Sequence, residues 1–313
     1  MGTGQIAAAR LKNGGMLNLD KFTQVGLINT MSGGVLAHDV KSAGAALSTG
    51  MAIEPGKVGL DTEGEVSYLL KWAMDRDLTT GLITTGSLAG SEVAPWVGRG
   101  AMTSDPYAQA KALVNNSPDL LIGGGSKYFS EQSDGENLHT AFRQKGYKVY
   151  KEIKKKPSKM KGDKMVVLAS GTSMPPASKR GNFFSAAWQT AQHHFPMMQG
   201  YFLIMTQPHV EWACVNKDID YLTSEMLDFD KTVGEIMEYA GMMQNTLVIV
   251  VGDREVGGLT VMDNGKGKPT YKWASTGSTA NMVPVYAYGV GAEVFSGQYQ
   301  NIELFNKITS LVD

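Results

Sequence analysis

The sequence has little that would mark a specialised class of protein. Cysteine occurs once, at Cys214, which excludes an internal disulfide and a cysteine-based zinc ribbon. No apolar run approaches the ~18 residues that span a bilayer, and we expect neither a membrane span nor a signal peptide before Met1. The net charge of −1 gives no indication of nucleic acid or an anionic membrane as a partner. The composition is that of an ordinary soluble globular chain.

What is present is an alternation of strand and helix candidates, with 37 glycines among 313 residues to make the turns between them. Apolar runs predict strands at 81–85, 119–122, 147–150, 165–169, 201–205, 247–251 and 282–288. Helical spacing predicts helices at 3–12, 64–76, 107–115, 137–145 and 218–239. This alternation favours an α/β fold, a mostly parallel sheet with helices on both faces. No boundary or repeat divides the chain, so we expect a single domain over residues 1–313.

The stretch 245–258, NTLVIVVGDREVGG, is the most informative part of the chain. Its five apolar residues, 247–251, predict a strand buried on both faces of a parallel sheet. Gly252 ends the run, so Asp253, Arg254 and Glu255 are expected at the carboxyl end of that strand. Ligands of open α/β sheets bind at that edge, which makes this turn the first place to look for chemistry.

Two further segments carry predictions about exposure. The helix expected at 218–239 has an apolar stripe of six residues, Ile219, Leu222, Met226, Phe229, Val233 and Ile236. Its acidic residues are expected mostly on the opposite, solvated face: Asp220, Glu225, Asp228, Asp230 and Glu235. The run 151–164, KEIKKKPSKMKGDK, predicts an exposed Lys-rich excursion between elements; a role in steering phosphate is the weaker reading.

Several blocks of the chain match the motifs of one known family, in the order in which that family carries them. MGTGQIAAAR is similar to the segment after the family's Gly-Asp-Gly-Met-Gly turn, and residues 39–50, DVKSAGAALSTG, are similar to its nucleophile motif. The other blocks are DLLIGGGSKYF, WACVNKDIDYLTSEMLDFDKTVG, TLVIVVGDREVGGLTV and STGSTANMVPVYAYGVGAEVFSG. Through these blocks the chain resembles the alkaline phosphatases over nearly its whole length.

The resemblance implies a three-layer α/β sandwich that hydrolyses phosphate monoesters through a phosphoserine. It also implies two zinc ions and a magnesium as cofactors, a possible homodimer, and a periplasmic or secreted location. The substrate-binding residues, and any partner other than a phosphate monoester, are unknown at this point. Such a mechanism needs a serine nucleophile activated by metal, and carboxylate and imidazole ligands to hold the ions.

Carried over by position, most of that machinery is replaced. The nucleophile position is Val40, so no catalytic residue is predicted. The phosphate-binding arginine falls near Ser104 and the magnesium-site threonine near Glu92, both in loosely matching stretches. The remaining implied metal positions are Thr206, Glu211, Val215, Asp253, Arg254 and Ser278. Asp253 is the only ligand position left unchanged. Glu211 keeps a carboxylate, but its side chain is longer than that of the aspartate it replaces.

These replacements predict a catalytically silent scaffold. Arg254 places a fixed positive charge where the family holds zinc, and it could pair with Asp253 or Glu211. The alternative is a metal-dependent phosphomonoesterase with a rebuilt, degenerate site that uses Glu92, Glu211, Asp253 and His209. Stoichiometric zinc or magnesium in the purified protein would favour that alternative.

Other residues also allow a functional reading. Ser42 could act as the nucleophile if the motif were shifted by two residues. His193, His194 and His209 could bind a metal, although surface or core histidines are commoner. Gly123, Gly124 and Gly125 could cradle phosphate, but a tight turn fits their spacing better. Cys214 is expected to be a small buried residue.

The resembling family also has an apolar strand before its Gly-Asp-Gly turn, inside the sheet, and this sequence begins after the matching position. Neighbouring strands would then present unpaired backbone groups. We therefore expect marginal stability or aggregation unless another segment occupies that place. A monomer with a cooperative melt well above about 65 °C would contradict this expectation.

Overall fold

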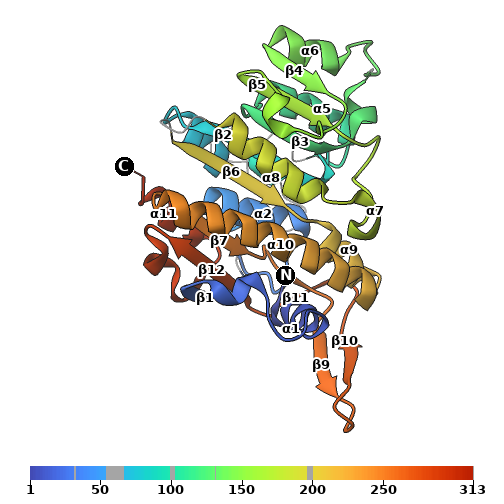
Figure 1. Ribbon diagram of the computed structural model, residues 1–313, viewed down its shortest axis with the longest axis vertical. Coiled ribbons are helices and arrows are strands. Elements are labelled where there is room, and N and C mark those ends of the chain that lie inside the picture. Colours follow the sequence, from blue (N-terminus) through green and yellow to red (C-terminus); the bar gives the residue numbers. More distant parts are fainter. Residues whose placement is uncertain (32, 54–66, 99–102, 131, 196–199, 313) are drawn as a thin grey trace. The chain divides into compact units, whose positions relative to one another are not determined.

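The computed structural model describes residues 1–31, 33–53, 67–98, 103–130, 132–195 and 200–312 (Figure 1). The chain groups into two compact units, one made of Met1–Gly59 and His209–Asp313, the other of Leu60–Pro208. We refer to them as unit 1 and unit 2 and describe each by itself. The single domain expected from the sequence stays a prediction.

Unit 1 is built around a four-stranded sheet with the order β13-β1-β12-β7. Its helices are α1 (Thr3–Lys12), η1 (Asn18–Lys21), α2 (Val40–Thr49), α9 (His209–Val215), α10 (Ile219–Met243), η5 (Ala292–Phe295) and α11 (Glu303–Thr309). Its strands are β1 (Gln24–Asn29), β7 (Leu247–Val251), β8 (Glu255–Val256), β9 (Leu259–Asp263), β10 (Pro269–Trp273), β11 (Ser278–Thr279), β12 (Val283–Gly289) and β13 (Gly297–Gln300). Strands β9 and β10 form a separate antiparallel hairpin.

Strand β7 forms where it was predicted, but its setting differs from the prediction. It pairs antiparallel with β12, and it stands at the end of the four-stranded order instead of inside a parallel sheet. Only Val248 and Val250 are buried, while the alternate residues are partly exposed. A continuous apolar run therefore does not specify the direction of pairing. Strand β12 lies between β1 and β7, and Pro284 is the second residue of that strand.

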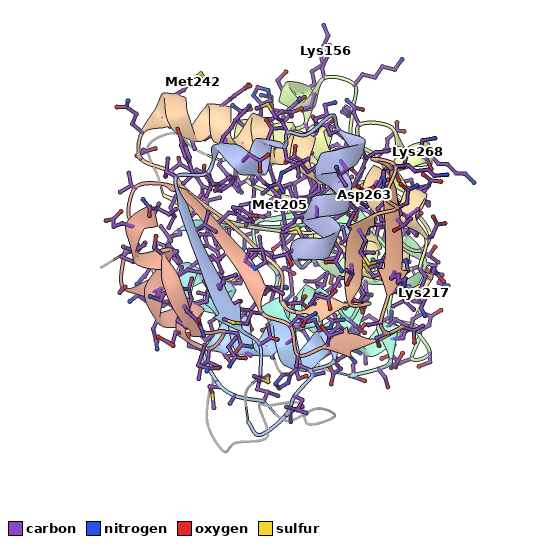
Figure 2. All side chains as sticks on the ribbon, turned by 90° about the horizontal axis from the view of Figure 1, so that it is seen from below. Lys156, Met205, Lys217, Met242, Asp263 and Lys268 are labelled. Carbon is purple, nitrogen blue, oxygen red and sulfur yellow. The ribbon has the colours of Figure 1, made fainter. Side chains whose placement is uncertain are left out.

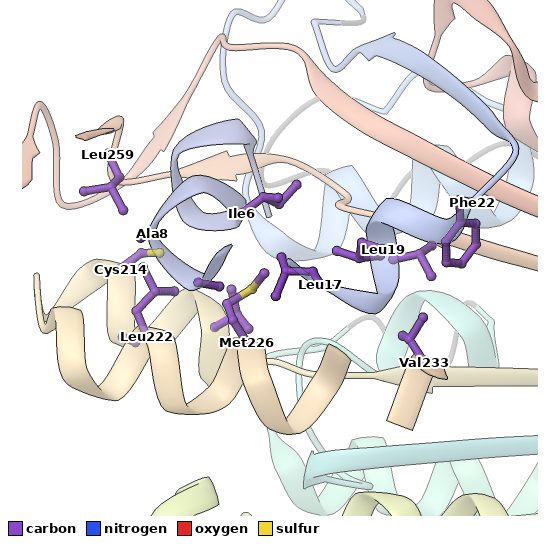
Figure 3. Packing of buried hydrophobic residues seen from close by; sticks show 14 of the residues in the cluster. Ile6, Ala8, Leu17, Leu19, Phe22, Cys214, Leu222, Met226, Val233 and Leu259 are labelled. Atoms are coloured by element: carbon purple, nitrogen blue, oxygen red, sulfur yellow. The ribbon is translucent and has the colours of Figure 1, made fainter. Parts of the chain in front are cut away.

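The core of unit 1 forms between α10, α1 and the segment that contains η1 (Figure 3). Leu222, Met226 and Val233 from α10 face Ile6 of α1 and Leu19 of η1. Three residues of the predicted apolar stripe belong to this buried cluster and the other three pack against it, which confirms that prediction. Gly234 lets η1 approach, because a Cβ there would lie 2.6 Å from Cγ of Asn18.

The predicted acidic face of α10 is wrong for two of its five residues. Glu225 is fully buried and Asp230 is 3% exposed, whereas Asp220 is exposed as expected. The carboxylate of Asp230 accepts hydrogen bonds from the backbone N–H groups of Asn18 (2.8 Å) and Leu19 (3.0 Å) and from the amide of Asn18 (3.1 Å). Asp230 thus fixes the start of η1 onto α10, a role that helical periodicity alone does not reveal.

Unit 2 contains a five-stranded sheet with the order β4-β5-β3-β2-β6, and every pair in it is parallel. Its strands are β2 (Thr79–Ser87), β3 (Leu120–Gly124), β4 (Tyr147–Tyr150), β5 (Lys164–Leu168) and β6 (Tyr201–Thr206). Its helices are α3 (Leu69–Met74), α4 (Ala94–Val97), α5 (Pro106–Asn115), η3 (Ser126–Phe129), α6 (Leu138–Gln144), η4 (Pro157–Lys159), α7 (Ala177–Arg180) and α8 (Phe183–His194). The first residues of the helix predicted at 64–76 lie outside the described residues.

This sheet confirms the predicted α/β architecture. Strands β2, β3 and β5 are buried almost throughout, as their apolar runs predict for parallel strands covered by helices. Strand β6 stands at one end of the order, and all six of its residues are partly exposed. The expected loss of stability from incompletely paired strands stays a prediction. Within the described residues, no helix combines the length and the apolar character that crossing a membrane requires.

Candidate functional site

The turn after β7 brings the first charged residues to the carboxyl end of that strand, as predicted. Gly252 is required there, because a Cβ would lie 2.5 Å from the carbonyl oxygen of Met1. The amino group of Met1 donates a hydrogen bond to the carbonyl oxygen of Arg254 at 2.9 Å. The first residue of the chain therefore packs directly against this turn.

Arg254 is the centre of the site. It is 3% exposed, and its guanidinium donates hydrogen bonds to Asp253 Oδ2 (2.5 Å), to Glu211 Oε1 and to Ser278 Oγ (3.0 Å). Asp253 also accepts a hydrogen bond from the backbone N–H of Arg254 at 2.8 Å. Pairing of Arg254 with Asp253 or Glu211 was expected, and the structure shows both. Helix α9 supplies Glu211 and β11 supplies Ser278, so four predicted metal-site positions meet in one network.

The charges in this network determine one another's pKa. Burial disfavours the charged guanidinium, but the attraction of Asp253 and Glu211 outweighs it and raises the pKa of Arg254. Burial raises the pKa of Glu211, and Asp253 adds to the rise, while Arg254 opposes it. One cation is thus shared between two carboxylates that repel each other. Arg254 stays charged, and burial disfavours the ionised form of Glu211.

These residues do not fit the zinc ions that the resemblance implies. Zinc requires several deprotonated nitrogen, sulfur or oxygen ligands around it. Here both carboxylates bond to a guanidinium whose positive charge repels a cation, and Val215, at the end of α9, is 41% exposed and has no ligand atom. Over the described ranges, no cluster of three or more histidine, cysteine, aspartate or glutamate side chains is arranged to hold a metal ion.

A second buried carboxylate, Glu255, belongs to the same turn; the sequence placed it at the end of the strand but assigned it no role. Glu255 is 3% exposed and accepts hydrogen bonds from Gln5 Nε2 (2.7 Å), from the backbone N–H of Gly258 (3.0 Å) and from Thr279 Oγ1. Glu255 is the first residue of β8, and the hydrogen-bond partners of its carboxylate come from three separate segments. Gln5 also lies 3.6 Å from Cys214 Sγ, and burial raises the pKa of that thiol to about 11. Cys214 is the small buried residue that was predicted.

The predicted nucleophile position opens α2. Val40 is the first residue of that helix, directly after Asp39, whose carboxylate accepts hydrogen bonds from the backbone N–H groups of Lys41 (2.8 Å) and Ser42 (3.0 Å). Valine offers no nucleophilic atom there. The alternative nucleophile, Ser42, is 1% exposed; its Oγ donates to the carbonyl of Asp39 at 3.3 Å and lies 3.2 Å from Nδ1 of His38. Substrate cannot reach Ser42 in this arrangement.

The histidines considered as metal ligands belong to two different helices. His193 and His194 end α8 in unit 2, whereas His209 begins α9 in unit 1. His209 is 2% exposed; its Nδ1 lies 2.5 Å from the hydroxyl of Tyr221 and 3.8 Å from Glu225 Oε1. His209 is therefore a satisfied core histidine that ties α9 to α10.

Of the glycines at 123–125, only Gly125 lies in the predicted tight turn, because Gly123 and Gly124 are the last two residues of β3. Gly124 is required because a Cβ there would lie 1.9 Å from the carbonyl oxygen of Thr172. Gly125 has φ of +97°, and its N–H donates to the carbonyls of Ser170 (3.0 Å) and Thr172 (2.5 Å). The N–H of Ser126 also donates to Ser170, at 2.9 Å. Since these N–H groups already bond to backbone, they do not form a cradle for phosphate.

Three other implied positions lie in unit 2. Thr206 ends β6, and its Oγ1 is buried with no hydrogen-bond partner within the described part of the chain. Glu92 precedes α4 and accepts a hydrogen bond through its carbonyl from Trp96 Nε1 at 3.1 Å. Ser104 is exposed just before α5. The roles assigned to these residues, and to Asp253 and Glu211 as metal ligands, stay predictions.

Comparison with known proteins identifies what this chain is similar to. The sequence profile of the family described as alkaline phosphatase matches residues 1–183. Alkaline phosphatase 4 of Bacillus subtilis (strain 168) is 24% identical, over all of this chain and 86% of that protein. Streptomycin-6-phosphate phosphatase of Streptomyces griseus is 22% identical, over 99% of this chain and 88% of that protein.

Solved structures agree with the sequence comparison. The alkaline phosphatase from the Antarctic bacterium TAB5 superimposes with a TM-score of 0.92 at 27% identity, over 99% of this chain and 94% of that one. The alkaline phosphatase of Thermus thermophilus superimposes with a TM-score of 0.86 at 17% identity, over 99% and 89% of the two chains. The α/β sandwich implied by the sequence is thereby confirmed.

Proposed function

The chain belongs to the alkaline phosphatase family, and we propose that it is a catalytically silent member of it, a phosphatase scaffold that does not hydrolyse phosphate monoesters. The proposal concerns the chemistry of the site and not the fold. It makes no use of bound zinc, because the residues around Arg254 do not fit that ion.

The observation that carries the proposal is the network around Arg254. A guanidinium hydrogen-bonded to Asp253, Glu211 and Ser278 occupies the positions where the family resemblance implies metal ligands. Replacing a cation with an arginine keeps the two carboxylates neutralised but supplies no Lewis acid. Arginine also cannot act as a general base, because it stays protonated at any pH at which the protein is folded.

The nucleophile position supports the same conclusion independently. Val40 begins α2 at the place where the family motif carries serine, and Ser42 is buried against His38. Both the attacking group and its activation are therefore missing from the described site. Because these two losses are in different elements, a change that restored one of them would leave the other.

The direct test is hydrolysis of an aryl phosphate by purified protein in zinc and magnesium buffer, with metal content measured on the same sample. We expect turnover at background and no stoichiometric metal. An Asp253→Ala variant, purified in parallel, identifies contamination, because a contaminating phosphatase is equally active in both samples. Chelator-sensitive turnover that Asp253→Ala abolishes would overturn the proposal and favour a degenerate but working metal site.

Restoring the nucleophile tests the proposal from the other side. We expect Val40→Ser to remain as inactive as Val40→Ala, because a serine hydroxyl is a weak nucleophile without a metal or base. A second variant adds Glu211→Asp, Val215→His, Arg254→His, Ser278→His and Thr206→Glu to Val40→Ser. Zinc binding by that variant, measured by calorimetry, reports on the ligands without depending on activity. Metal-dependent activity in Val40→Ser alone would show that the site already works.

A further inference from the structure

A dense group of exposed positive charges lies on β4, on the first residue of β5 and on the connection between these strands in unit 2. Residues 148–164 contain eight lysines, at 148, 151, 154–156, 159, 161 and 164, against two acidic residues, Glu152 and Asp163. This segment has a net charge of +6 in a chain whose total is −1. We call the eight lysines the lysine platform.

Every side chain of the lysine platform is exposed. None of the eight forms an ion pair with another described residue. Figure 2 shows Lys156 pointing away from the ribbon into open space. The platform therefore presents cationic groups that are free to meet an anionic partner.

The backbone beneath these lysines is held in place. Tyr150 Oη donates to the carbonyl of Lys161 (3.0 Å) and accepts from its N–H (3.2 Å), which ties the far side of the connection to β4. Met160 is 6% exposed and anchors the middle in the core. Lys154 and Lys164 lie over the rings of Tyr150 and Tyr147, at 5.3 and 5.6 Å. The lysines thus project from an ordered surface.

Protection of a sheet edge explains only part of this pattern. Strand β4 stands at the end of the sheet order, and lysine on an edge strand discourages pairing with another chain. That reasoning applies to Lys148, which lies in the strand. It does not apply to Lys154, Lys155 and Lys156, which lie in the connection and have no strand edge to protect.

We propose that the lysine platform is a docking surface for an anionic lipid bilayer. Clusters of four to eight basic residues adsorb to such surfaces, each contributing about 1 kcal/mol near the membrane. The platform has no exposed large apolar side chain, so it would lie on the headgroups without insertion. Residues 148–164 contain no arginine, the side chain that forms paired hydrogen bonds with base edges. Tyr147 is buried and Tyr150 is only partly exposed, so neither ring is open for a base to stack on. Both features disfavour a nucleic acid as the partner. This inference does not depend on catalytic silence.

The test is co-sedimentation of the full chain with vesicles of phosphatidylcholine alone or mixed with phosphatidylserine. We expect binding only to the mixed vesicles, and its loss when added salt shortens the Debye length from about 10 Å to about 3 Å. A triple variant, Lys154→Gln, Lys155→Gln and Lys156→Gln, should bind on the order of a hundredfold more weakly, from about fivefold per lysine.

The matched control removes the same charge from the β9–β10 hairpin, with Lys266→Gln, Lys268→Gln and Lys272→Gln. Those three lysines are also exposed, and Figure 2 shows Lys268 pointing away from the ribbon. We expect this control to bind vesicles like the unchanged protein, and both variants to keep its melting curve. Equal loss in both variants would show that only net charge matters and would overturn the proposal. Retention by duplex DNA at a salt concentration where vesicles are not bound would overturn it in favour of nucleic acid.

Discussion

The two units of this protein carry their charge in opposite ways. Unit 1 buries Arg254, Glu255, Glu225 and Asp230, none of them more than 3% exposed. Unit 2 instead concentrates lysines on one exposed connection, where they form no ion pairs with the described residues. The chain as a whole is nearly neutral, so neither arrangement is visible in its net charge.

The difference shows what each kind of charge can contribute. A buried charge costs several kcal/mol unless partners compensate it, so its presence implies a complete set of hydrogen bonds. Arg254, Glu255 and Asp230 each have such a set, from residues distant in the chain. An exposed lysine loses nothing by remaining unpaired, and it adds little to stability. Charges of unit 1 are therefore expected to hold the fold, and charges of unit 2 to serve contact with other molecules.

The largest expected effect is that of Arg254→Met. The substitution keeps an unbranched side chain of similar length but leaves Asp253 and Glu211 as uncompensated carboxylates, which should lower the free energy of unfolding by about 3–5 kcal/mol. Chemical denaturation measures this change. The control is Arg10→Met, whose partner Asp20 lies on the surface of unit 1, and it should cost about 0–1 kcal/mol. Equal losses of stability for the two substitutions would contradict the expected difference between a buried and a surface arginine.

The second largest loss of stability is expected for Asp230→Ala. It removes the acceptor for the N–H groups of Asn18 and Leu19 and should cost about 2–3 kcal/mol, since hydrogen bonds to a charged group are stronger than neutral ones. Asp220→Ala on the same helix, with a side chain that is 87% exposed, should change stability by no more than about 0.5 kcal/mol. Urea denaturation distinguishes the two. A neutral result for Asp230→Ala would mean that η1 is not held by this carboxylate.

A chemical probe reports whether the buried region of unit 1 excludes solvent. Burial raises the pKa of Cys214 to about 11, so little reactive thiolate forms at pH 8. We expect alkylation by iodoacetamide at pH 8 to be at least about a hundredfold slower in the folded protein than in guanidinium chloride. Mass spectrometry follows the reaction. Rapid labelling of the folded protein would show that the region around Gln5 and Glu255 opens readily.

The smallest expected effect on stability is that of removing exposed lysines from unit 2. Neutralising Lys154, Lys155 and Lys156 with glutamine should change the free energy of unfolding by no more than about 0.5 kcal/mol, because exposed charges that form no ion pair contribute little. Thermal unfolding with the unchanged chain as reference measures this. Marked destabilisation would place these lysines among the groups that hold the fold.

Local pattern in the sequence determined much of the architecture. The 3.6-residue spacing of Leu222, Met226 and Val233 specified the core face of α10, because side-chain direction in a helix repeats with a fixed period. Buried apolar runs specified β3 and β5 within one or two residues, since both are covered on two faces. The order of the family blocks specified the sandwich. The Asp253–Arg254 turn was also located from sequence, because it follows an apolar run directly.

Only the tertiary structure decided which groups those elements meet. Strand β7 has the same apolar run as a central parallel strand, yet it pairs antiparallel with β12, because pairing depends on neighbours that are distant in the sequence. Glu225 and Asp230 had the spacing of a solvated face and are buried, since η1 and α9 pack there. Arg254 could be placed beside Asp253 from the sequence. Its bonds to Glu211, 43 residues away, and to Ser278, 24 residues away, arise when the fold brings α9 and β11 to the end of β7.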